Sequence, residues 1–96
     1  MRKMKVAFKN EVTLDDNRRM RLEYVITENH RSITGKPYFG IQIIKYIDDD
    51  LEIEEIKGIS FSREKVEKMI KILYQQVVTP ISMVEIVDTL ITLEAV

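Results

Sequence analysis

Hydrophobic and polar residues alternate along the first part of the chain, which predicts two strands that each have one wet face. Apolar side chains occupy every second position over most of Met4–Leu14 and again over Met20–Ile26, with mainly charged residues between them. The polar segment Asp15–Asn17 separates the two runs, and asparagine tolerates the positive φ that a three-residue hairpin loop needs. We therefore expect an antiparallel hairpin closed by this loop.

The length of that loop decides which side chains meet across the hairpin. A three-residue loop gives apolar inward pairs, namely Val12 with Met20, Phe8 with Tyr24 and Val6 with Ile26. It also gives outward pairs of opposite charge, namely Glu11 with Arg21 and Lys9 with Glu23. A five-residue loop would instead oppose Glu11 and Glu23, and like charges across strands are unfavourable. The three-residue loop is therefore the better prediction.

Two further strands are predicted in the middle of the chain. Tyr38–Ile47 is apolar on both faces, as a central strand is, and three aspartates then turn the chain. Leu51–Ile59 follows as a fourth strand, and a slip in its apolar spacing predicts a β-bulge near Glu54–Glu55. The polar segment Glu28–Pro37 is expected to be the longest loop.

A first amphipathic helix is predicted after the strands. Apolar residues recur at spacings of three and four from Val66 to Val77, behind a serine cap at Ser60 or Ser62. Pro80 ends this helix, because proline disfavours helical conformation in the residue before it.

A second helix is expected to start at the capping box formed by Ser82 and Glu85. Its polar residues form one narrow stripe, so its apolar surface is wider than the arc of roughly 100° that a helix on a sheet needs. Two explanations stay open, and both can hold: the helix is wedged between sheet and first helix, or part of it faces a second subunit or partner. The candidate interaction residues are Met83, Ile86, Leu90 and Leu93.

The order of these elements predicts an α+β fold, ββββαα, in which two C-terminal helices pack on one face of a four-stranded antiparallel sheet. A chain of 96 residues is expected to be one domain, residues 1–96. The absence of cysteine excludes disulfides and sulfur-based metal sites. No apolar run approaches the roughly 20 residues of a membrane helix. We therefore expect no membrane contact and a cytoplasmic location.

Motifs that carry chemistry are missing from the sequence. His30 is the only histidine and lies in the polar loop, where a solvated side chain is the simpler interpretation. The acidic segment Asp48–Glu55 lacks the ligand spacing of an EF-hand, so a solvated turn is the simpler prediction. There is no glycine-rich phosphate loop. We expect no enzyme activity, no catalytic residue, no cofactor and no metal.

Basic residues gather in the first hairpin, although the net charge of the chain is only −1. The candidate basic patch consists of Lys3, Lys5, Lys9, Arg19 and Arg21. Such charges commonly protect edge strands from aggregation, and the alternative is contact with an acidic partner or RNA. The outward positions of the first two strands carry no aromatic residue for base stacking. No lysine or arginine follows Lys71, which argues against a helix-turn-helix and against nucleic acid as the partner.

Two long segments, FKNEVTLDDNRRMRLEYVI and SREKVEKMIKILYQQVVTPISMVEIVDTLI, resemble a family of small proteins from spore-forming clostridia, a domain of unknown function. The resemblance covers most of the chain and is most specific over VTPISMVEIVDTLI. It implies a small bacterial cytoplasmic protein and carries over no active-site residue. The wide apolar surface of the second helix favours a non-catalytic protein-interaction or regulatory module that binds a protein partner or self-associates. Nucleic-acid binding through the basic first hairpin is the alternative.

Overall fold

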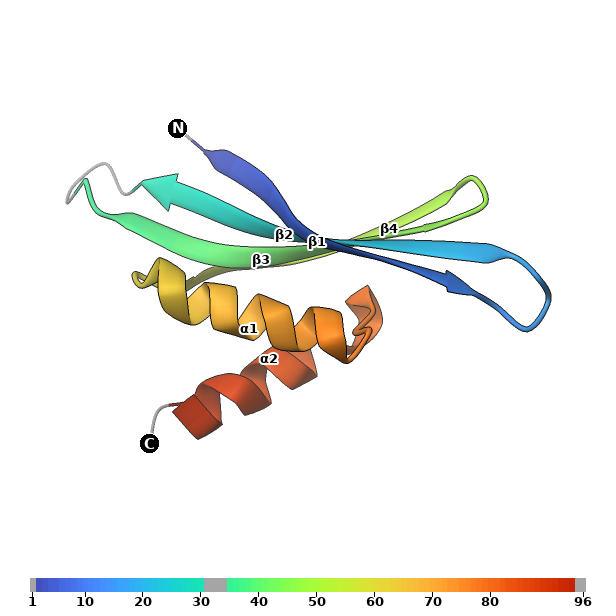
Figure 1. Ribbon diagram of the computed structural model, residues 1–96. Coiled ribbons are helices and arrows are strands. Elements are labelled where there is room, and N and C mark those ends of the chain that lie inside the picture. Colours follow the sequence, from blue (N-terminus) through green and yellow to red (C-terminus); the bar gives the residue numbers. More distant parts are fainter. Residues whose placement is uncertain (1, 31–34, 95–96) are drawn as a thin grey trace.

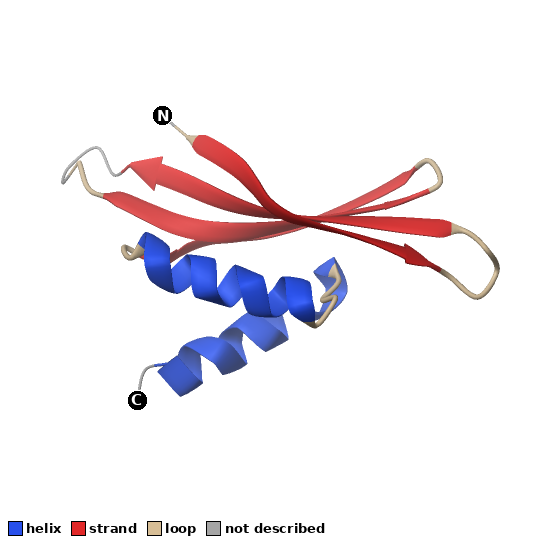
Figure 2. Cartoon of the chain, in the orientation of Figure 1, coloured by secondary structure: helices blue, strands red, loops and turns tan. Residues whose placement is uncertain are grey.

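The computed structural model describes residues 2–30 and 35–94 and shows a sheet covered by helices on one face (Figure 1). Four antiparallel strands lie in the order β1 (Lys3–Thr13), β2 (Arg19–His30), β3 (Pro37–Ile47) and β4 (Asp50–Ser60). Two helices follow, α1 (Arg63–Gln75) and α2 (Pro80–Glu94). Figure 2 shows both helices on the same side of the sheet, so the predicted ββββαα arrangement is confirmed.

The loop of the first hairpin has the predicted length and conformation. Asn17 adopts a φ of 66°, and the backbone N–H of Leu14 donates to the carbonyl oxygen of Arg18 at 2.8 Å. Four predicted pairs form in this register, namely Val12 with Met20, Phe8 with Tyr24, Glu11 with Arg21 and Lys9 with Glu23. The hairpin is therefore confirmed from its loop as far as Phe8.

A β-bulge at Ala7 changes the pairing toward the N-terminal end of β1. The predicted pair of Val6 with Ile26 is wrong, because Val6 lies opposite Val25 and Lys5 lies opposite Ile26. A bulge places two residues of one strand opposite a single partner, so every side chain beyond it changes face. Lys5 consequently lies on the helix-covered side, and Val6 on the helix-free face.

The irregularity in β4 is also displaced from its predicted position. Pairing is regular at Glu54 and Glu55, and the register shifts instead between Ile56 and Ser60, where Gly58 has a φ of 64°. The odd apolar spacing has a different cause: Ile53 lies on the helix-free face and Ile56 on the covered face. Apolar residues on both faces of one strand break the period-two alternation in the sequence, and a β-bulge breaks it in the same way.

Helix α1 begins and packs as predicted. The side chain of Ser62 accepts the backbone N–H of Lys65 at 3.3 Å, which identifies Ser62 as the N-cap. The buried face of α1 consists of Val66, Met69, Ile70 and Leu73. The helix ends at Gln75, so Val77 does not continue this stripe; it is exposed, and Val78 enters the core instead.

Helix α2 starts earlier than predicted. Its first residue is Pro80, and the backbone N–H of Ser82 donates to the carbonyl oxygen of Thr79 at 3.1 Å. The predicted start at the capping box of Ser82 is therefore wrong. Proline suits a first helical position because its missing N–H has no intrahelical partner there.

Hydrogen bonds from two residues of the sheet connect it to the end of α1 and to the turn that follows. The hydroxyl of Tyr24 donates to the carbonyl oxygen of Val78 at 3.0 Å. The side-chain amide of Asn10 donates to the carbonyl oxygen of Tyr74 at 2.8 Å. Phe8 stacks on the ring of Tyr74 with centroids 4.6 Å apart. These contacts place α1 alongside β1.

Replacing Tyr24 with phenylalanine tests this connection. At pH 7 we expect the free energy of unfolding to fall by about 1–2 kcal/mol, because the carbonyl of Val78 loses its buried donor. Burial raises the pKa of Tyr24 above its ordinary value of 10.0, so the unfolded chain releases this proton at a lower pH than the folded chain. The contribution of Tyr24 is therefore complete below pH about 10 and declines above it. Urea unfolding of both proteins at pH 7 and 11 should show the difference narrowing, and a constant difference would contradict this role.

Candidate functional site

The four residues predicted to form an interaction surface on α2 have different environments. Met83 is fully buried in the core, which removes it from any surface of the folded chain. Ile86 and Leu90 are partly buried against the same core, whereas Leu93 is 66% exposed. The reason is that α2 packs against β3, β4 and α1, and Met83 lies on the side that faces them. Only Leu93 of the four is well exposed.

Other apolar side chains of α2 point outward instead. Ile81 is 86% exposed, Val84 52% and Ile91 37%. With the exposed Asp88 they follow a spacing of three and four residues, so all four lie along one side of the helix. We call Ile81, Val84, Asp88 and Ile91 the α2 stripe. The sequence pattern did not single out these positions, because α2 is apolar around most of its circumference and the pattern does not indicate which side packs on the core.

The α2 stripe is acidic, because Asp88 lies within it and Glu85 lies beside it. Glu85 and Asp88 are both exposed, and no lysine or arginine occurs between Ile72 and Leu93. Large apolar side chains next to a polar border are typical of surfaces that contact another protein.

The helix-free face of the sheet also exposes apolar side chains near its corners. Met4 and Val6 lie on β1, and Leu51 and Ile53 lie on β4, all of them exposed. Arg2 pairs with Glu55 of β4, so a side chain next to one edge strand reaches the other edge strand. Val25, nearer the centre of this face, is buried.

The five residues of the predicted basic patch do not lie together. Lys9, Arg19 and Arg21 are on the helix-free face, where each already has a neighbour. Lys9 is 4.0 Å from Glu23, Arg19 is 2.8 Å from Glu11, and Arg21 lies 4.8 Å from the ring centre of Tyr46. Lys3 and Lys5 lie on the other side of β1, because the bulge at Ala7 reverses the faces beyond it.

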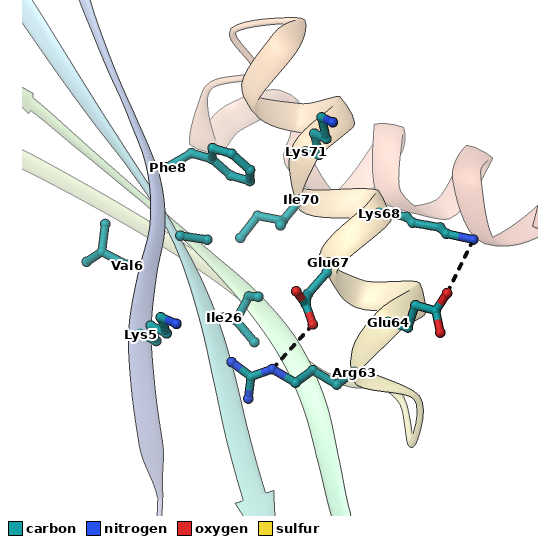
Figure 3. Close-up of a pocket in the computed structure, with 11 residues that line it drawn as sticks. Lys5, Val6, Phe8, Ile26, Arg63, Glu64, Glu67, Lys68, Ile70 and Lys71 are labelled. Carbon is teal, nitrogen blue, oxygen red and sulfur yellow. Dashed lines mark ion pairs between the residues drawn. The ribbon is translucent and has the colours of Figure 1, made fainter.

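A groove between β1 and α1 was not predicted from the sequence. It contains a cleft of about 400 Å³ whose apolar wall comes from Ala7, Phe8, Ile26 and Ile70 (Figure 3). Its polar border consists of Lys5, Arg63, Glu64, Glu67, Lys68 and Lys71. A second cleft of about 430 Å³ shares Lys5, Ile26 and Arg63 with the first, so the two form one continuous groove. We call this the β1–α1 groove.

Two of the four cations at the first cleft already have carboxylate partners on α1. Arg63 lies 3.4 Å from Glu67, and Lys68 lies 3.8 Å from Glu64. Figure 3 shows both pairs, with the side chain of Val6 pointing to the opposite side of β1. The groove arises only when β1 and α1 come together, so no local sequence pattern indicates it.

The structure adds little to the other chemical candidates. His30 has its Nε2 atom 3.0 Å from Oε2 of Glu28, and it lines neither cleft of the groove. The predicted loop Glu28–Pro37 is too long, because β2 extends to His30 and β3 begins at Pro37; residues 31–34 lie outside the described residues. Within residues 2–30 and 35–94, no group of three or more His, Cys, Asp or Glu side chains is placed to hold a metal ion. None of the helices in the same ranges has the length and apolar character needed to span a membrane.

Comparison with known proteins identifies a family without giving an activity. A family model described as DUF6514, a family of unknown function, matches residues 3–93. The search of curated proteins and the search of solved structures each found no match.

A pair of substitutions tests the placement of α2. Met83→Ala should lower the free energy of unfolding by about 3 kcal/mol, because it leaves a cavity in the core. Leu93→Ala should change it by less than about 0.5 kcal/mol, because the side chain is mostly in solvent. Urea unfolding of the two variants measures both values, and equal losses would show that α2 packs through a different side.

Proposed function

Since the chain belongs to the DUF6514 family of unknown function, we propose that it is a non-catalytic protein-interaction or regulatory module located in the cytoplasm. The observation that supports this function is the α2 stripe, in which Ile81 and Val84 remain 86% and 52% exposed on a folded chain. Burying such side chains against a partner contributes roughly 25 cal/mol per Å² of apolar area removed from water. The clostridial origin expected from the resemblance remains a prediction.

The charge around the α2 stripe favours a partner different from the chain itself. A symmetric contact between two α2 helices would bring Glu85 and Asp88 of each copy close to the same acids of the other. Like charges at an interface are unfavourable, and α2 carries no cation to offset them. The partner that fits is therefore a protein with an apolar surface bordered by lysine and arginine.

Nucleic-acid binding through the first hairpin is not the function that the side chains support. Lys9 and Arg19 pair with carboxylates and Arg21 stacks on Tyr46. A phosphate backbone would have to displace these contacts before it gained its own.

Paired substitutions on two surfaces test the α2 stripe. Ile81→Ser with Val84→Ser removes its most exposed apolar groups. Leu51→Ser with Ile53→Ser is the matched control, because these side chains are 55% and 52% exposed on the helix-free face. Each tagged protein is incubated with nuclease-treated native lysate, and the captured protein is then purified and titrated against all three chains by calorimetry.

We expect the α2 variant to bind the purified partner at least tenfold more weakly than wild type, and the control to bind within twofold of it. Equal affinities for the α2 variant and wild type would overturn this function for the α2 stripe. Light scattering of wild type alone should give the mass of a monomer. A dimer that the α2 substitutions dissociate would replace the partner with a second copy.

A further inference from the structure

We propose that the β1–α1 groove binds an extended peptide segment that adds to the sheet as a fifth strand beside β1 and presents both apolar and acidic side chains on its groove-facing side. This contact surface is separate from the α2 stripe and does not depend on it. The partner class follows from three properties of the groove: a free strand edge, an apolar wall and cations without partners.

The free strand edge is the backbone of β1. This strand has 11 residues and pairs only with β2 in the described sheet, so one row of its N–H and C=O groups has no strand partner. Figure 1 shows β1 at the margin of the sheet with α1 beneath it. An extended peptide recognises such an edge through main-chain hydrogen bonds, while pockets beside the edge select alternate side chains.

The apolar wall lies beside this edge, on the side of α1. Phe8, Ile26 and Ile70 border the cleft, and Figure 3 shows their side chains between β1 and the helix. Side chains of an added strand alternate between the two faces of the sheet, so every second residue of the peptide would face this wall. These groove-facing residues must therefore supply both the apolar side chains that contact the wall and the carboxylates that reach the cations.

The cations give the peptide its charge. Four cationic side chains and two carboxylates line the first cleft, which leaves an excess of two positive charges. Arg63 and Lys68 have carboxylate partners, whereas Lys5 and Lys71 form no ion pair with any described residue. The bulge at Ala7 is what brings Lys5 to this side of β1. Carboxylates on the peptide would supply the missing partners.

Cations attract RNA as well as acidic peptides, but the aromatic side chain of the groove favours a peptide. Phe8 already stacks on Tyr74 with ring centroids 4.6 Å apart, so one face of its ring is occupied. Single-stranded RNA recognition depends on aromatic faces that are open to bases. Lysines on an edge strand can also serve only to prevent pairing with other chains. The experiment must therefore distinguish this protective role from binding of a peptide.

The first test uses an acetylated and amidated eight-residue peptide with a fluorophore for anisotropy, in which serine occupies the even positions and valine and glutamate alternate at the odd positions, so that valine and glutamate face the same side of the strand. We expect Lys5→Glu with Lys71→Glu to weaken its binding at least tenfold. Lys57→Glu with Lys65→Glu makes the same charge change outside the groove, and this control should bind within twofold of wild type. Equal weakening of the two variants would show attraction by overall charge alone and would overturn the assignment.

Two N-methylated versions of the peptide test strand addition directly. In a strand, alternate residues direct their N–H groups toward the same neighbour. N-methylation of the serines alone, and of the valines and glutamates alone, should therefore have unequal effects, with one version losing at least tenfold in affinity and the other binding within about twofold of the parent. Equal effects would overturn addition to β1.

Chemical shifts of the wild-type chain provide a measurement that does not depend on any variant folding. The peptide should shift backbone amides of β1 and α1 and leave those of β4 unchanged. Ile81→Ser with Val84→Ser should bind the peptide like wild type, so a failure of the α2 stripe and a failure of the groove are distinguishable. A 12-residue oligouridine that bound more tightly than the peptide, and lost affinity in Lys5→Glu with Lys71→Glu, would replace the peptide with RNA.

Discussion

The hydroxyl of Tyr24 lies where the sheet meets the connection between the two helices, and its bond to the carbonyl of Val78 fixes their positions. Each such hydrogen bond contributes only about 1 kcal/mol to stability, but its geometry is specific. With Asn10 bound to Tyr74, it places the end of α1 over the first hairpin. The helix then runs alongside β1, and α2 is directed toward β3, β4 and α1. Both candidate surfaces depend on this placement.

The bulge at Ala7 determines which side chains reach the groove. Without it, the alternation through Met4, Val6 and Phe8 would place all three on the covered face. With it, Lys5 borders the groove, while Met4 and Val6 are exposed on the opposite face. The sequence pattern does not indicate the bulge, because the apolar alternation continues unbroken through it. The small side chain of Ala7 is the only local irregularity.

Sequence reasoning succeeded where a local rule has one solution. Asn17 and the charges of Glu11 and Arg21 were sufficient to predict the loop of the first hairpin and its register from the loop as far as Phe8. The stripe from Val66 to Leu73 was sufficient to predict the buried face of α1. The sequence did not indicate the buried side of α2, because apolar residues occupy most of its circumference. Only the positions of the sheet and α1 decide that Met83 is buried and Ile81 is exposed.

A net charge of −1 conceals a separation of charge between the two candidate surfaces. The α2 stripe contains Asp88 and lies beside Glu85, whereas the β1–α1 groove has an excess of positive charge. Opposite charges would attract α2 of one copy to the groove of the next, but a helix already uses its backbone groups internally and cannot pair with a strand edge. A contact between the α2 stripe of one copy and the groove of the next would also leave one free stripe and one free groove in every assembly of two copies. Further copies could then add, which favours open chains over a closed dimer. Two different partners, one with an apolar surface bordered by basic residues and one extended and acidic, satisfy both surfaces without this consequence.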